Sequence, residues 1–196
     1  MNLAKFPRRG YVTEPTPLEA LPNFSKALGA DINIYIKRDD LTGIGLGGNK
    51  IRKLEFLLAD AKRKGAEVVF TTGGAQSNHA MLTAACAKKL GMEPILILKK
   101  RGVTERKGNQ LLEYLMDTDV RFMDTDSYDD IDAEMDRVGK ASGKKYYKIP
   151  CGGTHAGVAL GAMLYMPQTK TVGLMVDSDP FEVITTNIMQ ETAKLL

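Results

Sequence analysis

Between residues 68 and 80 the sequence reads VVFTTGGAQSNHA. The run Val68–Thr72 is rich in β-branched and aromatic residues and predicts a buried strand, which Gly73-Gly74 ends in a turn. Ser77 precedes a stretch that predicts a helix over His79–Leu90. A strand that leads through a tight turn into a helix directs free backbone N–H groups and the positive end of the helix dipole at one point, so this stretch predicts an anion site.

A second segment has the same order of elements. The predicted strand Lys145–Ile149 leads through Gly152-Gly153 to Thr154 and a helix near His155–Tyr165. Helix capping alone would also explain Ser77 and Thr154. Both turns lie beside a histidine, and the chain has only two histidines. We therefore predict two anion sites.

From residue 66 onward the chain alternates short apolar runs with amphipathic stretches, as parallel strands joined by crossover helices do. We therefore predict an α/β fold. The N-terminal part differs, because Pro15-Thr16-Pro17-Leu18 predicts an extended entry and Ile32–Lys37 predicts a strand. The remaining predicted strands are Pro94–Lys99, Val120–Asp124 and Thr171–Val176, and the remaining predicted helices are Asn109–Met116, Tyr128–Ala141 and Phe181–Leu196.

Composition and charge argue against several classes of protein. The chain has 196 residues, is 43% hydrophobic, and carries 27 basic and 24 acidic residues. A net charge of +3 without long runs of one sign makes nucleic acid and anionic membranes poor partners, and we predict neither. No apolar run is long enough to span a bilayer and the N-terminus lacks a signal-peptide core, so we expect a cytoplasmic protein. Cys86 and Cys151 form no CxxC pair, and we predict no metal site.

A glycine loop, GIGLGG at residues 43–48, opens onto a predicted helix at Lys50. The loop matches the dinucleotide pattern GxGxxG weakly. That pattern requires an acidic residue at the end of the next strand, whereas Glu67 lies before that strand begins. Nucleotide binding stays open as a minor alternative. Lys50 lies in the first turn of the helix, with Arg52 and Lys53 close behind it. Clustered cations and a helix N-terminus disfavour protonation, so we predict a lowered pKa and a nucleophilic Lys50.

Four motifs occur in order along the chain. They read IKRDDLT at residues 36–42, GGNKIRKLE at 47–55, QSNH at 76–79 and GTHAG at 153–157. Together they resemble the D-cysteine desulfhydrase and 1-aminocyclopropane-1-carboxylate deaminase family, fold-type II enzymes that use pyridoxal 5′-phosphate and are related to the tryptophan synthase β subunit. The resemblance implies open, mostly parallel sheets with flanking helices.

The resemblance also implies roles for individual residues. Lys50 would be the catalytic residue and would form the Schiff base with pyridoxal 5′-phosphate, while Asn78 would bind the ring hydroxyl of the cofactor. We assign neither His79 nor His155 a role in proton transfer. The phosphate contacts would be Lys53, Gly152, Gly153 and Thr154, and the substrate contacts would be Gln76, Ser77, Asn78 and His79.

The expected activity is that of a carbon–sulfur lyase, which converts D-cysteine to pyruvate, hydrogen sulfide and ammonia. The alternative within the family is 1-aminocyclopropane-1-carboxylate deaminase, and an alternative of another class is a catalytically impaired cofactor-binding remnant or interaction module. The expected partners are a small amino-acid substrate and, as the family implies, a second copy of the chain in a homodimer.

The chain departs from the family pattern at one internal position. After the strand that ends at Pro150, members of the family continue through a Gly-Gly turn into another helix and strand, and a second glycine turn then leads to the Thr-His-Ala-Gly motif. In this chain the single turn Cys151-Gly152-Gly153 takes the place of both turns. We expect an internal deletion at this point and a C-terminal truncation. The family pattern predicts that residues 1–51 begin a large cofactor domain, 52–150 form a small open α/β domain, and 151–196 form part of the large domain. An incomplete large domain should expose apolar surface.

Overall fold

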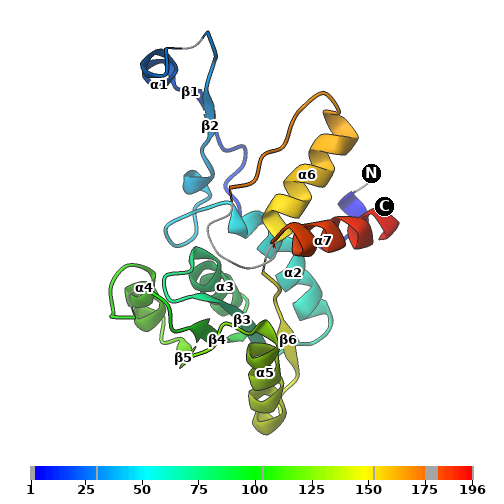
Figure 1. The fold of residues 1–196 in the computed structure, drawn as a ribbon. Helices are drawn as coiled ribbons and strands as arrows, with labels where there is room; N and C mark the ends of the chain where they lie inside the picture. The colour runs from blue at the N-terminus through cyan, green and yellow to red at the C-terminus, as the bar shows by residue number, and fades with distance from the viewer. Residues whose placement is uncertain (1–2, 30, 103, 152, 175–180, 196) are drawn as a thin grey trace.

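The computed structural model describes residues 3–29, 31–102, 104–151, 153–174 and 181–195. An N-terminal arm, residues 16–37, extends away from a body of helices around a parallel sheet (Figure 1). The strands are β1 (Leu18–Ala20), β2 (Tyr35–Lys37), β3 (Val68–Gly74), β4 (Glu93–Lys99), β5 (Asp119–Met123) and β6 (Tyr146–Lys148). The α-helices are α1 (Pro22–Ala27), α2 (Lys50–Arg63), α3 (Asn78–Lys89), α4 (Asn109–Leu115), α5 (Tyr128–Ser142), α6 (Gly153–Tyr165) and α7 (Phe181–Leu195), and short 3-10 helices span Leu3–Lys5 and Asp39–Leu41.

The four-stranded sheet is parallel throughout, with the strand order β5-β4-β3-β6. Phe70 of β3 pairs in register with Ile95 of β4 and with Lys148 of β6. The chain runs outward from β3 through β4 to β5, and then returns to the other side of β3 to form β6. Open α/β sheets bind ligands at such a reversal, beyond the carboxyl ends of the strands. The topology therefore places a binding crevice where β3 and β6 end.

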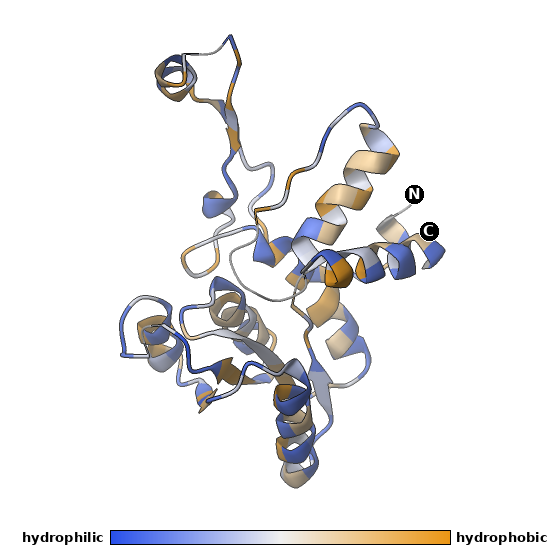
Figure 2. Cartoon of the chain, in the orientation of Figure 1, coloured by the Kyte–Doolittle hydropathy of each residue, from blue (hydrophilic) through white to orange (hydrophobic). Residues whose placement is uncertain are grey.

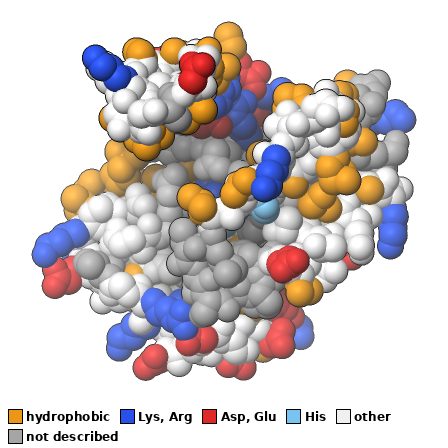
Figure 3. Space-filling view, turned by 45° about the horizontal axis from the view of Figure 1, so that its top comes forward, with side chains coloured by type: hydrophobic (Ala, Val, Ile, Leu, Met, Phe, Trp, Pro, Cys, Tyr) orange, Lys and Arg blue, Asp and Glu red, His pale blue; other side chains and the backbone are white. Residues whose placement is uncertain are grey.

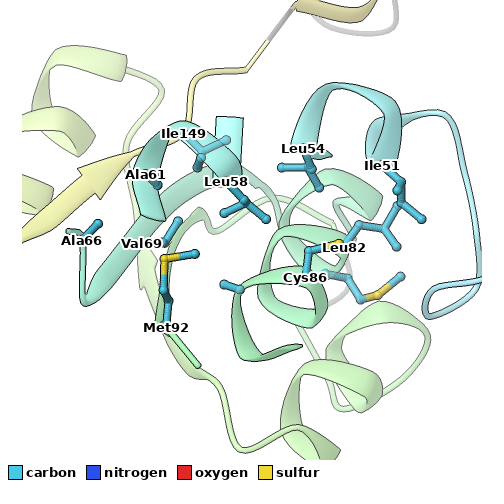
Figure 4. Close-up of a cluster of buried hydrophobic side chains, with 12 residues drawn as sticks. Ile51, Leu54, Leu58, Ala61, Ala66, Val69, Leu82, Cys86, Met92 and Ile149 are labelled. Carbon is cyan, nitrogen blue, oxygen red and sulfur yellow. The ribbon is translucent and has the colours of Figure 1, made fainter. Parts of the chain in front are cut away.

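Helices cover both faces of this sheet. Successive residues of a strand point to opposite faces, so Val68 and Phe70 pack against α5 while Val69 packs with α2 and α3 (Figure 4). Full burial of one aliphatic or aromatic side chain contributes roughly 1.5–3 kcal/mol. The buried side chains around Val69 form the largest hydrophobic cluster among the described residues, and this cluster fixes the starts of α2 and α3 against the sheet. Its buried members are Ile51, Leu54, Leu58, Ala61, Ala66, Val69, Met81, Leu82, Cys86, Ala87, Met92 and Ile149.

The segment before the glycine loop is tied to α2 by a buried carboxylate. The side chain of Glu55 is 1% exposed and accepts hydrogen bonds from the backbone N–H groups of Tyr11 and Val12 at 2.6 and 3.0 Å. The guanidinium of Arg8 donates to the same carboxylate at 2.7 Å. These bonds compensate the cost of burying the charge, which is high for an unpaired carboxylate.

Two regions leave large apolar side chains in contact with solvent. In the arm, Leu18 is 65% exposed and Tyr35 is 56% exposed. Helix α6 is strongly apolar (Figure 2), yet its buried residues are Ala156 and Ala162. Apolar side chains gather on the arm and around α6 on the face shown in Figure 3. The domain division that assigns both regions to a large domain stays a prediction.

The predicted α/β class is confirmed, and the elements between residues 66 and 165 begin and end within two residues of the predicted bounds. One predicted strand was too long, and a second was wrong over its described residues. Ile32–Lys37 is a strand only over Tyr35–Lys37, and residues 171–174 form no strand; residues 175 and 176 lie outside the described part of the chain. A Cβ atom at Gly173 would lie 2.7 Å from the ring of His155, so this segment packs beside α6 and not along a sheet edge.

Among the described residues, no helix has the length and apolarity needed to cross a membrane.

Candidate active site

The glycine loop is folded tightly against the start of α2. Gly47 and Gly48 have φ angles of 71° and 130°, a region that side chains other than glycine rarely adopt. The N–H of Gly48 donates to the carbonyl of Asp39 at 2.7 Å and to the hydroxyl of Thr42 at 3.0 Å. These bonds determine where the loop ends, and α2 begins two residues later at Lys50.

Lys50 is half-buried and lines a cavity of about 1060 Å³. Burial lowers the pKa of Lys50, while the nearby sulfur of Cys151 acts in the opposite direction. The predicted direction of the shift is therefore confirmed, but its cause was wrong, because burial is the largest effect and clustered cations are not. Arg52 points away and binds Asp39 with two hydrogen bonds of 2.7 and 2.8 Å.

The cavity lies at the carboxyl ends of β3 and β6, where the sheet topology predicts a crevice. Its walls come from the starts of α2, α3, α5 and α6 and from α7. Its size suits a cofactor together with a small substrate, since ligand pockets usually measure about 300–1,000 Å³. The lining residues are Lys50, Lys53, Thr72, Gly73, Gly74, Ser77, His79, Tyr128, Cys151, Thr154, His155, Val158, Ala159, Thr171, Val172, Gly173, Leu174, Glu182, Thr185, Thr186 and Met189.

Ser77 caps α3 at the edge of this cavity. Its hydroxyl accepts a hydrogen bond from the N–H of Ala80 at 3.2 Å, so the capping interpretation is confirmed. Ser77 also lines the cavity, and the N-terminus of α3 therefore opens toward it. A Cβ atom at Gly73 would lie only 2.5 Å from the Ser77 hydroxyl. Glycine at position 73 is thus required for the close approach of β3 to the start of α3.

Two other predicted contacts of the QSNH motif bind the protein itself. The side chain of Gln76 donates to the carbonyl of Lys107 at 3.1 Å and accepts from the N–H of Asn109 at 3.0 Å. The amide of Asn78 donates to the carbonyl of Gly47 at 3.2 Å and joins α3 to the glycine loop. Neither residue is among those that line the cavity.

His79 is buried in the cavity wall as a neutral imidazole. Burial lowers its pKa to about 3, and the charges of Lys53 and Lys50 add to this effect. The Thr71 hydroxyl donates to the carbonyl of Ile149 at 3.0 Å, so His79 Nε2, which lies 3.0 Å from that hydroxyl, is the donor in their hydrogen bond. The ring therefore joins α3 to β3 and, through Thr71, to the residue that follows β6.

The second predicted anion site brings together Lys53 and the start of α6. Thr154 lines the cavity in the first turn of α6, and a Cβ atom at Gly153 would lie 4.0 Å from the side chain of Lys53. The ammonium of Lys53 donates to the carbonyl of Pro150 at 3.0 Å. Burial lowers the pKa of Lys53 to about 8; Cys151 raises it and Lys50 lowers it. The predicted contact Gly152 lies outside the described residues.

Most of the residues that line the cavity were not predicted from the sequence, and three of them are important below. Thr72, Tyr128 and Cys151 belong to three separate segments that meet only in the folded chain. For Thr72, its position at the end of a predicted strand and before a Gly-Gly turn could have indicated a place at the site. Within the described ranges, no three His, Cys, Asp or Glu side chains are grouped as a metal site would require.

Comparison with known proteins agrees with this geometry. A model of the family "Pyridoxal-phosphate dependent enzyme" matches residues 11–151. The chain belongs to this family. The chain is 41% identical to a putative 1-aminocyclopropane-1-carboxylate deaminase from Pyrococcus horikoshii, with 99% of the chain and 71% of the relative covered. It is 45% identical to D-cysteine desulfhydrase from Salmonella typhimurium, with 84% of the chain and 51% of the relative covered.

Solved structures show the same fold. A crystal structure of a 1-aminocyclopropane-1-carboxylate deaminase homologue superposes with a TM-score of 0.89 and 38% identity, and the match covers 98% of this chain and 70% of that one. A pyridoxal 5′-phosphate-dependent aspartate racemase superposes with a TM-score of 0.56 at 18% identity, and this match shows only that the two folds are similar.

The chain is shorter than these relatives. It spans about half the length of the Salmonella enzyme and of a second Pyrococcus relative, from P. abyssi. The alignment with the P. horikoshii relative is 235 positions long, whereas the chain has 196 residues, so that relative contains residues opposite gaps in this chain. The family match ends at Cys151, where we predicted an internal deletion.

Proposed function

We propose that this chain binds pyridoxal 5′-phosphate through Lys50 and acts on a small amino acid, with D-cysteine as the leading substrate and carbon–sulfur bond cleavage as the reaction. One observation carries this proposal. Lys50 has a pKa lowered by burial and opens onto a cavity that has helix N-termini on two sides. A lysine that loses its proton readily can attack an aldehyde, and helix N-termini bind anions.

The residues present fit the parts of the cofactor and the substrate. The phosphate would lie between Lys53 and the start of α6 at Gly153 and Thr154, and the substrate carboxylate would lie at the start of α3, where Ser77 caps the helix. The bound cofactor would withdraw electrons from the Cα atom of the substrate. Neutral Lys50 would accept the Cα proton, because its lowered pKa favours the unprotonated amine.

Three of the predicted contacts bind other parts of the chain, and this proposal gives them supporting roles. Asn78 holds the glycine loop against α3 with one amide N–H. Because Asn78 does not line the cavity, a hydrogen bond to the cofactor's ring hydroxyl would require its side chain to move. Gln76 fixes the segment before α4. We therefore infer that Gln76 supports the substrate site from outside the cavity wall, and that His79 does so as a buried neutral ring.

Ring-opening deamination of 1-aminocyclopropane-1-carboxylate is a second candidate, because relatives from three Pyrococcus species carry that name as putative deaminases. A third candidate is a cofactor-binding protein without turnover, since the chain spans only part of its relatives. Both enzymatic candidates begin with the same lysine and differ in the bond that breaks. The products of the two reactions distinguish them.

The experiment supplies the purified chain with pyridoxal 5′-phosphate and either D-cysteine or 1-aminocyclopropane-1-carboxylate. Sulfide and pyruvate from D-cysteine support the leading proposal, and 2-oxobutyrate from the cyclic substrate supports the second. Cofactor binding without either product supports the third. L-cysteine is the matched control, because it has the same atoms with the opposite configuration at Cα.

We also propose the domain division that the family pattern predicts. In this division residues 52–150 form a small α/β domain around the parallel sheet, and residues 1–51 and 151–196 contribute to a large cofactor domain. The exposed apolar side chains of the arm and α6 favour a further contact surface. We propose a homodimer that covers part of it.

A further inference from the structure

A thiol lies in the wall between the candidate active site and a smaller cavity. The smaller cavity has a volume of about 380 Å³ and lies between the start of α5 and the end of β6. Thr72, Tyr128 and Cys151 line both cavities. We call these three residues the neck. Both cysteines of the chain are reduced thiols, but Cys86 is fully buried in the core whereas Cys151 is partly exposed at the neck.

Lysine side chains lie close to the neck. Lys50 and Lys53 line the larger cavity together with Cys151, and Lys53 donates to the carbonyl of Pro150, the residue before Cys151, at 3.0 Å. The sulfur of Cys151 acts electrostatically on both ammonium groups. The ammonium of Lys99 lies 3.8 Å from the centre of the Tyr128 ring. Positive charge near a sulfur favours the thiolate, which is the reactive form of cysteine.

The neck also contains a hydroxyl group with no hydrogen-bond partner among the described residues. Thr72 is 6% exposed, and its Oγ1 atom makes no hydrogen bond in the described chain. The thiol of Cys151 donates to the backbone carbonyl of the same Thr72 at 3.4 Å, so hydroxyl and sulfur lie on adjacent parts of the neck. Buried polar atoms of native proteins are almost always paired with protein, water or a ligand. The Thr72 hydroxyl therefore indicates a ligand atom that accepts a hydrogen bond beside Cys151.

The charges on the two sides of the neck differ. Asp129 and Asp132 line the smaller cavity, where Asp132 binds Lys148 at 2.8 Å. Lys50 and Lys53 line the larger cavity, to which α7 contributes Glu182. A carboxylate attached near Cys151 would therefore be attracted toward the two lysines and repelled from the smaller cavity.

We propose that Cys151 is a modification site for small anionic disulfides, the oxidised form of carboxylate-bearing thiols. The thiolate of Cys151 attacks one sulfur of the disulfide, and a new S–S bond forms as the original S–S bond breaks. The other half leaves as a thiolate, which takes a proton from water when its pKa is above the pH of the solution. The disulfide is the oxidant, so the exchange is balanced. Lys53 and the Thr72 hydroxyl bind the carboxylate of the attached half.

The test compares two disulfides on the full chain without added cofactor, so that its outcome does not depend on the proposed function. The probes are 5,5′-dithiobis(2-nitrobenzoate), which is anionic, and cystamine, which is cationic. We expect one native thiol to react, and to react about tenfold or more faster with the anionic probe after correction for the rates of the two probes with a free thiol. Mass spectrometry should place the label on the peptide that contains Cys151.

Matched variants determine which groups are responsible. Cys151→Ser should abolish labelling of the native chain, and Cys86→Ser should leave it unchanged. Lys53→Gln should reduce the preference for the anionic probe about tenfold, whereas Lys62→Gln, which removes an α2 lysine with a similar bond to a backbone carbonyl, should not. Thr72→Val should also weaken the preference. Labelling of Cys86, equal corrected rates for the two probes, or an unchanged preference in both Lys53→Gln and Thr72→Val would each overturn the proposal.

Discussion

The charge of Lys53 should control the affinity of the cavity for phosphate-bearing ligands. Burial lowers the pKa of this side chain to about 8, so it is mostly protonated at pH 7 and mostly neutral at pH 9. A hydrogen bond to a charged group contributes about 1.5–3 kcal/mol, which corresponds to roughly 10- to 100-fold in affinity. Lys53→Met should therefore weaken binding of a phosphate ester about 10- to 100-fold at pH 7, and much less at pH 9 and above.

Pyridoxine 5′-phosphate is a suitable probe, because it carries the phosphate but no aldehyde and cannot bond covalently to Lys50. Its dissociation constant would be measured for the wild-type chain and for Lys53→Met from pH 6.5 to 10, and the ratio of the two constants removes the titration of the probe itself. Lys62→Met is the matched control, since Lys62 also donates to a backbone carbonyl at 3.0 Å but lies at the other end of α2. A ratio near one at pH 7, or one that does not fall as the pH rises through about 8, would refute the assignment of Lys53 to the phosphate.

The same lowered pKa has a consequence for stability. The unfolded chain holds a proton on Lys53 up to the ordinary value of 10.5, whereas the folded chain releases it near 8. The unfolded state therefore binds more protons between these pH values, and the free energy of unfolding should rise with pH in this window by at most about 3 kcal/mol from this group. The cost of the buried charge is fully present below pH 8 and disappears above pH 10.5.

Three further predictions follow from the structure. Ser77→Ala should weaken binding of the amino-acid substrate more than binding of the cofactor and Thr154→Val should do the reverse, as measured by titration, and equal effects on cofactor affinity would contradict two separate anion sites. Glu55→Ala should lower the free energy of unfolding in urea by about 1–3 kcal/mol, because it leaves the backbone N–H groups of Tyr11 and Val12 without an acceptor. Glu55→Gln should be less harmful because its amide oxygen can still accept these two groups, and equal losses would argue against those bonds. The exposed apolar side chains of α6, among them Met163 at 65% exposed, should make the 21.5 kDa chain self-associate, and light scattering would measure this. A wild-type chain that is monomeric, together with a Met163→Glu variant that is no more soluble, would contradict the prediction.

Much of the fold could be predicted from the sequence because local pattern and tertiary structure agree in the central part of the chain. The runs Val68–Thr72 and Pro94–Lys99 are rich in strand-forming residues and are buried on both faces in the structure. The segment 171–174 has a similar composition but packs beside α6. A strand requires a neighbouring strand, and residue composition does not specify that neighbour.

Prediction of the candidate site succeeded where a motif and an element boundary coincide. Lys50 and Ser77 are both at helix starts and both line the cavity. The cause of the lowered pKa of Lys50 was missed, because residues adjacent in a helical sequence point in different directions and Arg52 binds Asp39 instead. The neck at Cys151 was missed because it forms only when three distant segments meet.

The central claim is that Lys50 forms the bond to pyridoxal 5′-phosphate, and borohydride reduction followed by peptide mapping tests it most directly. The chain would be mixed with the cofactor, its visible absorption recorded, and the lysine–cofactor bond reduced so that the modified peptide can be identified. We expect the cofactor on the peptide that contains Lys50, with the visible band lost in Lys50→Ala and retained, though weakened by poorer binding, in Lys53→Ala. A band that persists in Lys50→Ala and disappears in Lys53→Ala, with the cofactor found on Lys53, would contradict the account.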